Sequence, residues 1–254
     1  MWWLKKMTLL AFMVAAMSAG FSTGALAGQE IVVSAAASLA DAFTRIGRDF
    51  EGANPGVKVS LNFGASGALL QQIAQGAPVD VFASADLETM EKARAKGLVN
   101  ASSIKNFAEN KLVLITPKGS AVKGLKDLGG DSVKRIAVGK PETVPAGHYT
   151  REALEKDGMW GRLEPKFIYA ESVRQVLDYV SRGEVDAGFV YATDAAVVAA
   201  KVRVVSEVGG HKPVVYPIAI VSSGKNPEVA GRFIKYVLGG KGQAVLARYG
   251  FTRP

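Results

Sequence analysis

Short apolar segments alternate with amphipathic segments along most of the chain. The short apolar segments are typical of buried strands, and the amphipathic segments carry apolar residues three and four positions apart, which is typical of helices. In the first part of the chain the expected strands are 31–33, 57–63 and 79–83, and the expected helices are 39–52, 68–75 and 87–96. Regular alternation of this kind predicts an α/β fold, with mostly parallel sheets flanked by helices.

The second part of the chain follows the same plan. The expected strands are 112–116, 135–138, 166–169, 187–190 and 216–221, and the expected helices are 146–156, 173–182, 194–200 and 227–248. Residues 76–86 and 183–194 also resemble each other, because both contain a helix end, a Val-Asp pair, an apolar strand, small residues and an aspartate. Two similar lobes of about a hundred residues each fit the length of the chain.

We therefore predict two lobes joined by two crossover strands. The end of the chain is expected to return to the first lobe, so that lobe I comprises residues 28–112 and 216–254, and lobe II comprises residues 113–215. The crossings are expected near residues 111–117 and 216–222. Ligands of open α/β sheets bind beyond the carboxyl ends of the strands, so the expected ligand cleft lies between the lobes.

The N-terminus has the pattern of a cleaved secretory signal. Lys5 and Lys6 precede the mainly apolar residues 7–21, and Ala25-Leu26-Ala27 follows as a small-x-small cleavage site. The apolar stretch is too short to span a bilayer comfortably. We expect residues 1–27 to be removed on export, leaving a soluble mature chain.

Composition narrows the class of partner. The chain has no cysteine, which excludes disulfides, thiolate metal ligands and a lipid-modified cysteine. Its formal net charge is +8, but the basic residues are scattered among acids and form no cluster with interleaved aromatic residues. Nucleic acid is therefore not an expected partner, although a mild positive field helps to attract an anion.

Five turns that follow expected strands and open expected helices are rich in small residues. They are residues 35–39, 64–68, 144–147, 171–174 and 191–194. Small residues let the backbone approach a ligand closely, and the free N–H groups of a helix start suit an anion. Ser38 and Ser66 are the candidate hydroxyl donors, although serine before a helix commonly acts only as an N-cap.

Basic residues are scarce in these turns, so a bound anion would be held mainly by neutral donors. An organic carboxylate would favour an arginine fork, for which Arg174 is the candidate, but we expect Arg174 to be an exposed charge on a helix surface. Glu171, Asp86 and Asp194 lie near the turns, which leaves phosphate open as a ligand because its proton needs an acceptor.

The main alternative class is a serine hydrolase. The segment 64–67 hints at a nucleophile elbow, but that motif needs glycine where Ala68 stands. Only His148 and His211 could act as bases, and we expect His148 to be a surface helix residue. Residues 239–242 lack the Ser or Thr of a phosphate-binding loop, and the sequence shows no metal-ligand cluster. We therefore expect a binding protein with no catalytic residue and no cofactor.

At these turns the chain resembles the periplasmic molybdate-binding proteins of ABC importers, which are type II periplasmic binding proteins. The resemblance covers essentially the whole chain after residue 27. It rests on Ala-Ala-Ser-Leu at 36–39, Phe-Gly-Ala-Ser at 63–66, Gly-Ala-Pro-Val-Asp-Val-Phe-Ala-Ser-Ala-Asp at 76–86, Val-Pro-Ala-Gly at 144–147, Tyr191 before Asp194, and Arg-Tyr-Gly-Phe at 248–251.

The resemblance implies that the ligand is molybdate, with tungstate as a near-equivalent, bound as the oxyanion without direct metal ligands. The implied binding residues are Ser38, Ser66, Ala146, Val173 and Tyr191. The two serines would give hydroxyl and backbone donors, Ala146 and Val173 backbone N–H groups, and Tyr191 its phenol. The resemblance also implies delivery to a membrane permease, and we expect a monomer. Sulfate or phosphate is the closest alternative ligand.

Overall fold

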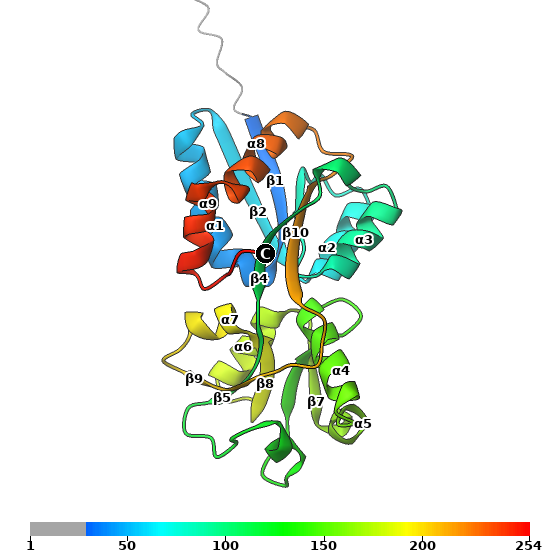
Figure 1. Cartoon of the computed structure of the whole chain (residues 1–254), viewed down its shortest axis with the longest axis vertical. Coiled ribbons are helices and arrows are strands. Elements are labelled where there is room, and N and C mark those ends of the chain that lie inside the picture. The colour runs from blue at the N-terminus through cyan, green and yellow to red at the C-terminus, as the bar shows by residue number, and fades with distance from the viewer. Residues whose placement is uncertain (1–28) are drawn as a thin grey trace, which may run out of the picture.

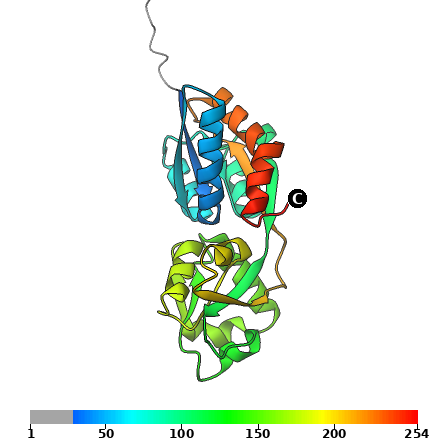
Figure 2. The ribbon, with the colours of Figure 1, turned by 90° about the vertical axis from the view of Figure 1, so that its left-hand side faces the viewer.

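The computed structural model describes residues 29–254, which form two α/β lobes placed end to end (Figure 1). The expected signal segment, residues 1–27, lies outside the described residues. Within residues 29–254 no helix is both long and apolar enough to cross a membrane. Two thin connections between the lobes run along the same side of the molecule (Figure 2).

The first lobe is built on a five-stranded sheet with the strand order β2-β1-β3-β10-β4. Its strands are β1 (Gln29–Ala36), β2 (Val57–Gly64), β3 (Val81–Ala83), β4 (Lys105–Asn110) and β10 (Val214–Ile220). Its helices are α1 (Ala40–Ala53), α2 (Ser66–Ala74), α3 (Leu87–Ala95), α8 (Pro227–Leu238) and α9 (Gly240–Arg248). Helices α1, α8 and α9 gather at one side of the lobe, and α2 and α3 lie at the other (Figure 1).

The second lobe has a five-stranded sheet with the order β7-β6-β8-β5-β9. Its strands are β5 (Leu112–Pro117), β6 (Ile136–Gly139), β7 (Phe167–Ala170), β8 (Ala187–Tyr191) and β9 (Val202–Glu207). Its helices are α4 (Pro145–Lys156), α5 (Trp160–Leu163), α6 (Val173–Ser181) and α7 (Ala192–Val197).

The two sheets share one plan, as the resemblance between segments 76–86 and 183–194 predicted. In each sheet three neighbouring strands are parallel, and the other two pair antiparallel. The aspartate of each Val-Asp pair has a similar role. The carboxylate of Asp80 accepts hydrogen bonds from the backbone N–H groups of Val32 and Asn226, and that of Asp186 accepts them from Lys134 and Arg135. Asp80 thereby links β1 to the start of α8, and Asp186 holds the chain just before β6.

The predicted two-lobed α/β architecture is confirmed, but each sheet is mixed. The sequence pattern did not predict β4 and β9, which are the outer antiparallel strands of the two sheets. Strands at a sheet edge are half exposed and therefore carry more polar residues, and β4 has the sequence Lys-Asn-Phe-Ala-Glu-Asn. The expected C-terminal helical region, 227–248, consists of two helices, because Gly239 in extended conformation separates α8 from α9.

The two passages between the sheets differ in length. The first consists of Lys111, which separates β4 from β5, and the second comprises residues 208–213, between β9 and β10. Both expected crossings lie slightly C-terminal to these passages, because most of 111–117 is β5 of the second sheet and most of 216–222 is β10 of the first.

The core of the first lobe explains why α1 forms where it does. Its apolar residues at positions 42, 43, 46 and 50 make one buried face. The Phe43 ring lies 5.7 Å from Phe107 of β4 and 6.1 Å from Phe233 of α8, and Phe50 lies 5.3 Å from Phe233. Aromatic pairs of this kind each contribute about 0.5–1.5 kcal/mol beyond the burial of their area. This packing holds the N-terminal turn of α1, next to Ser38, in a fixed position.

Candidate functional site

A small cavity lies between the lobes, and all five residues implied by the resemblance line it. The complete lining is Ala36, Ala37, Ser38, Gly64, Ala65, Ser66, Ala85, Val144, Pro145, Ala146, Val173 and Tyr191. Its volume of about 10 Å³ is far below the roughly 300–1,000 Å³ of most small-molecule sites, so a ligand larger than a water molecule needs the lobes to move slightly apart. The lining contains no charged side chain and no histidine. The cavity therefore suits a single small ligand that neutral groups can hold.

The first lobe contributes two serines from neighbouring turns. Strands β1 and β2 are parallel and end in register, with Ala36 opposite Gly64, so the turns that follow them lie side by side. Ser38 is in the 3-10 turn before α1, and Ser66 is the first residue of α2. Both serines are buried.

Neither serine acts as a helix N-cap. The N-cap residues of α1 and α2 are Leu39 and Ala65, and no side chain caps either helix. Instead, Ser38 Oγ lies 3.0 Å from the Tyr216 hydroxyl, and Ser66 Oγ accepts a hydrogen bond of 3.0 Å from Ala85 N–H. The N-cap interpretation of these serines is therefore wrong.

The second lobe contributes three helix starts in the same way. Strands β6, β7 and β8 are parallel neighbours, and α4, α6 and α7 follow them in the chain. Ala146 is the second residue of α4, Val173 is the first of α6, and Tyr191 is the N-cap of α7. The first N–H groups of a helix have no partner within it, so these starts bring backbone donors to the cavity.

The phenol of Tyr191 is the most informative group in the cavity. Its hydroxyl is fully buried and has no hydrogen-bond partner among the described residues. Burial raises the pKa of Tyr191 well above its ordinary value, so the hydroxyl keeps its proton. A buried, unpaired donor is costly, and it points to a ligand that accepts a hydrogen bond.

Tyr216 contacts the cavity residue Ser38, and the sequence pattern did not identify Tyr216 as part of the site. Its hydroxyl contacts Ser38 Oγ and accepts a hydrogen bond of 3.2 Å from Asn110 Nδ2, and Asn110 also donates to Thr193 Oγ1 of the second lobe. No local pattern could have identified Tyr216, because strand pairing brings β10 beside β3 and Ser38 is 178 positions away.

Beside the cavity, Arg174 joins the two lobes. Its Nε donates to Asp194 Oδ1 at 2.6 Å, and its Nη2 donates to Asp41 Oδ2 of the first lobe at 2.7 Å. Its side chain is only 24% exposed. The expectation that Arg174 is an exposed surface charge is therefore wrong. The two carboxylates occupy its guanidinium, and Arg174 does not line the cavity.

Asp194 is the buried member of this group. Its side chain is fully buried, and burial raises its pKa to about 6, while the charge of Arg174 acts in the opposite direction. Its Oδ2 also accepts a hydrogen bond of 3.3 Å from the backbone N–H of Tyr191.

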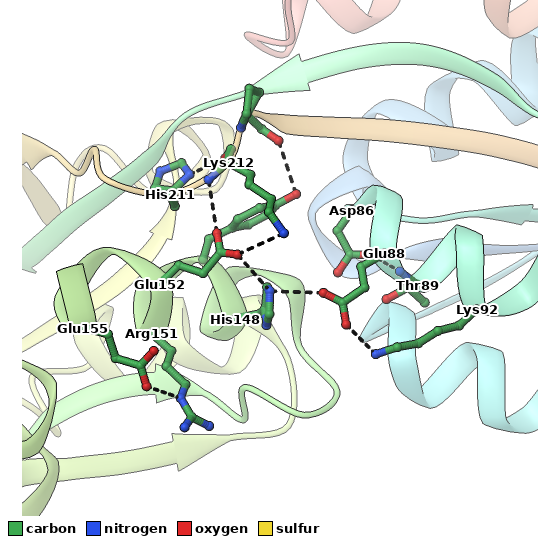
Figure 3. Close-up of polar contacts among 12 residues, drawn as sticks. Asp86, Glu88, Thr89, Lys92, His148, Arg151, Glu152, Glu155, His211 and Lys212 are labelled. Atoms are coloured by element: carbon green, nitrogen blue, oxygen red, sulfur yellow. Dashed lines mark hydrogen bonds and ion pairs between the residues drawn. The ribbon is translucent and has the colours of Figure 1, made fainter.

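The other side of the cavity carries a second ionic contact between the lobes (Figure 3). Nε2 of His148, on α4, lies 3.3 Å from Glu88 of the first lobe and 3.3 Å from Glu152 on its own helix. Lys212 of the long passage contacts Glu152 as well. The His148 side chain is 32% exposed, so the expected surface residue is half-buried and takes part in the contact between the lobes.

The backbones of the two lobes also touch directly. Gly67 N–H donates to Thr143 O at 2.9 Å, and a Cβ atom at Gly67 would lie only 2.8 Å from the backbone of Thr143. From the sequence, the small residues of this turn were expected to make room for a ligand. At Gly67 it is the opposite lobe that needs the space. The lobes are thus in contact around the cavity.

The serine hydrolase alternative gains no support from the cavity. His148 and His211 are absent from the cavity lining, so neither lies beside Ser66 as a base. Among residues 29–254, no three His, Cys, Asp or Glu side chains form a group that could hold a metal ion.

The chain is similar in sequence to known bacterial solute-binding proteins. The family described as bacterial extracellular solute-binding protein matches residues 31–252. The chain is 40% identical to the molybdate-binding protein ModA of Escherichia coli, over 95% of this chain and 96% of that protein. It is 35% identical to ModA of Haemophilus influenzae, over 98% of this chain and 99% of that protein.

A solved structure shows the same fold. The periplasmic molybdate-binding protein of Azotobacter vinelandii superimposes with a TM-score of 0.80 at 27% identity, covering 88% of this chain and 99% of that one. By fold, length and sequence, this chain belongs to the family of bacterial extracellular solute-binding proteins.

Proposed function

We propose that this chain binds molybdate or tungstate in the cavity between its lobes and delivers the oxyanion to the membrane permease of an ABC importer. The observation that carries the proposal is the buried, unpaired hydroxyl of Tyr191 in a cavity lined by neutral groups. The names of the relatives support the ligand, and the five lining residues named above are its proposed contacts.

The hydroxyl group of each serine can donate a hydrogen bond to a ligand. Ser66 Oγ already accepts a hydrogen bond from Ala85 N–H, which leaves the hydrogen of its hydroxyl free for a ligand. A hydroxyl can accept and donate at once, so Ser38 has the same freedom when Tyr216 donates to it. Burial raises the pKa of Tyr216 as well, so this tyrosine retains the proton that it would donate.

Neutral donors are sufficient for tight binding of a dianion. A hydrogen bond to a charged group contributes about 1.5–3 kcal/mol, and each helix start adds about 0.3–1 kcal/mol. The proposed contacts supply seven donors: a hydroxyl and a backbone N–H from each serine, one N–H each from Ala146 and Val173, and the Tyr191 phenol. Seven such bonds give a gross contribution of roughly 10–20 kcal/mol. The costs of desolvating the ion and of restricting its motion reduce this value. Nanomolar affinity needs about 12 kcal/mol, which this site can reach without a cation in the cavity lining.

We expect the same arrangement of donors to discriminate among oxyanions. A smaller ion such as sulfate would leave some of the converging donors unpaired, and each unpaired buried donor costs about 1–3 kcal/mol. Protonated phosphate needs an acceptor for its proton, and the lining offers no carboxylate. We therefore propose molybdate and tungstate ahead of sulfate and phosphate.

Calorimetric titration of the ligand-free protein tests this order. We expect molybdate and tungstate to bind with one site per chain and sulfate and phosphate to bind at least 100-fold more weakly. Equal binding of sulfate, or no binding of molybdate, would overturn the proposed ligand.

The remaining parts of the proposal concern the protein in the cell. We propose that the chain is exported to the periplasm with cleavage after Ala27, acts as a monomer, and releases its ligand chemically unchanged. Mass spectrometry of the exported protein tests the cleavage site, because the expected mature chain begins at Gly28.

A further inference from the structure

Three charged residues beside the cavity each follow a cavity residue closely in the sequence. Asp41 is three positions after Ser38, Arg174 immediately follows Val173, and Asp194 is three positions after Tyr191. Their side chains form one ionic chain, Asp41–Arg174–Asp194, which runs from the first lobe to the second. The ionic chain therefore connects the beginnings of α1, α6 and α7.

The ionic chain continues to the cavity through one backbone hydrogen bond. One oxygen of the Asp194 carboxylate binds Arg174, and the other accepts the N–H of Tyr191. The orientation of this carboxylate thus depends on Arg174 and affects the position of the residue that carries the unpaired phenol.

The two contacts of Arg174 differ in location. The contact with Asp194 lies within the second lobe and is buried, whereas the contact with Asp41 exists only when the two lobes meet. A planar guanidinium presents donors in a fixed fork and can bind both carboxylates at once, which a lysine ammonium does less well.

We propose that Arg174 is a positioning residue that couples closure of the lobes to the placement of Tyr191. When the lobes close, Asp41 accepts the second hydrogen bond of the guanidinium. This contact holds Arg174 and Asp194, and with them the turn at Tyr191, in the geometry that the ligand requires. This inference rests on the proposed function, because its effect is measured as oxyanion affinity.

Asp41→Asn is the most direct test. Asp41 is partly exposed, so the change removes the contact between the lobes and leaves the buried Arg174–Asp194 pair intact. We expect the dissociation constant for molybdate to rise about 3–5-fold, as befits a partly exposed ion pair, and Asp41→Glu to restore most of the affinity.

Asp49→Asn is the matched control. Asp49 lies on the same helix and pairs with Arg45 of the same lobe, so it changes the net charge equally without affecting the contact between the lobes. We expect its dissociation constant to stay within twofold of that of the unmodified protein.

Arg174→Gln should act more strongly, with affinity reduced about 100-fold, because it leaves the buried Asp194 without a counterion. In the double variant Asp41→Asn/Arg174→Gln, the Asp41 change should have no further effect. Because Asp41→Asn leaves the buried pair in place, it tests the inference even if Arg174→Gln does not fold.

The outcomes separate the two proposals. If the unmodified protein binds molybdate and Asp41→Asn binds as tightly as Asp49→Asn, the role of Arg174 in closure is wrong and the proposed function stands. If the unmodified protein binds none of the oxyanions, both proposals fail.

Discussion

On each side of the cavity a contact between a basic side chain and a carboxylate joins the two lobes, but the basic group differs between the two sides. On one side Arg174, just after Val173, reaches Asp41 of the first lobe. On the other side His148, two positions after Ala146, reaches Glu88, which is three positions after the cavity residue Ala85. In each case a residue near a helix start of lobe II meets a carboxylate that follows a cavity residue of lobe I.

The difference lies in burial and in the permanence of the charge. Arg174 is always charged and has a fully buried partner, Asp194. His148 is charged only when protonated, and its partners Glu88 and Glu152 are both partly exposed. An exposed ion pair contributes about 0–1 kcal/mol, whereas removing one member of a buried pair costs about 3–5 kcal/mol. We therefore expect the Arg174 side to dominate both stability and closure.

Arg174→Gln should give the largest effect on stability. It leaves the carboxylate of Asp194 buried and unpaired, so we expect the free energy of unfolding to fall by about 3 kcal/mol. Urea unfolding measures this value. Arg45→Gln, which removes an exposed pair on α1, is the control and should change the same free energy by less than about 0.5 kcal/mol.

Gly67→Ala should prevent the lobes from meeting on the His148 side. The added methyl group would lie 2.8 Å from the backbone of Thr143, so the closed state must open or shift. We expect molybdate affinity to fall about 10–100-fold, which corresponds to about 1.4–2.8 kcal/mol, while the unfolding temperature of the ligand-free protein changes little.

Gly52→Ala is the control for this change, because a Cβ atom there has nothing within 4 Å. Unchanged affinity in Gly67→Ala would show that the Arg174 side alone is enough for closure.

Asp194 gives the Arg174 side a defined pH dependence. Because the folded protein raises the pKa of this carboxyl from 3.8 to about 6, the folded state binds its proton more tightly than the unfolded state. The resulting stability is complete below pH 3.8 and is lost as the pH rises through about 6.

Comparison with Asp194→Asn isolates this effect. We expect the free energy of unfolding of the unmodified protein, minus that of Asp194→Asn, to decrease by about 1–3 kcal/mol between pH 4 and pH 7. Denaturant unfolding at a series of pH values measures this difference. A difference that stays constant or increases with pH would contradict the raised pKa.

His148→Gln should have the smallest effect. Its contacts at 3.3 Å are long and partly exposed, so we expect less than a threefold change in molybdate affinity at pH 7. A loss comparable with that of Arg174→Gln would reverse the proposed order of the two sides.

Local patterns were enough to predict the alternation of strands and helices, the duplicated plan, and the turns that carry Ser38 and Ser66. They succeeded because a parallel sheet brings consecutive turns to one edge. The family resemblance pointed to Ala146, Val173 and Tyr191, and the structure places all five residues around one cavity.

Features that depend on distant contacts were not predictable in this way. Arg174 was expected to be exposed because Asp41, 133 positions away, and Asp194, 20 positions away, are not evident as its neighbours in the sequence. The close approach at Gly67 was likewise invisible, because Thr143 belongs to the other lobe. The edge strands β4 and β9 were missed because half-exposed strands lack a continuous apolar run.

Anomalous diffraction from crystals grown with molybdate tests the central claim most directly. The cavity is neutral, whereas a separate groove on lobe I is lined by Arg48, Lys241 and Arg248, so the two locations represent opposite ways to bind an anion. We predict one strong molybdenum peak in the cavity, within reach of the Ser38, Ser66 and Tyr191 hydroxyls. A peak at the basic groove with an empty cavity would contradict the account.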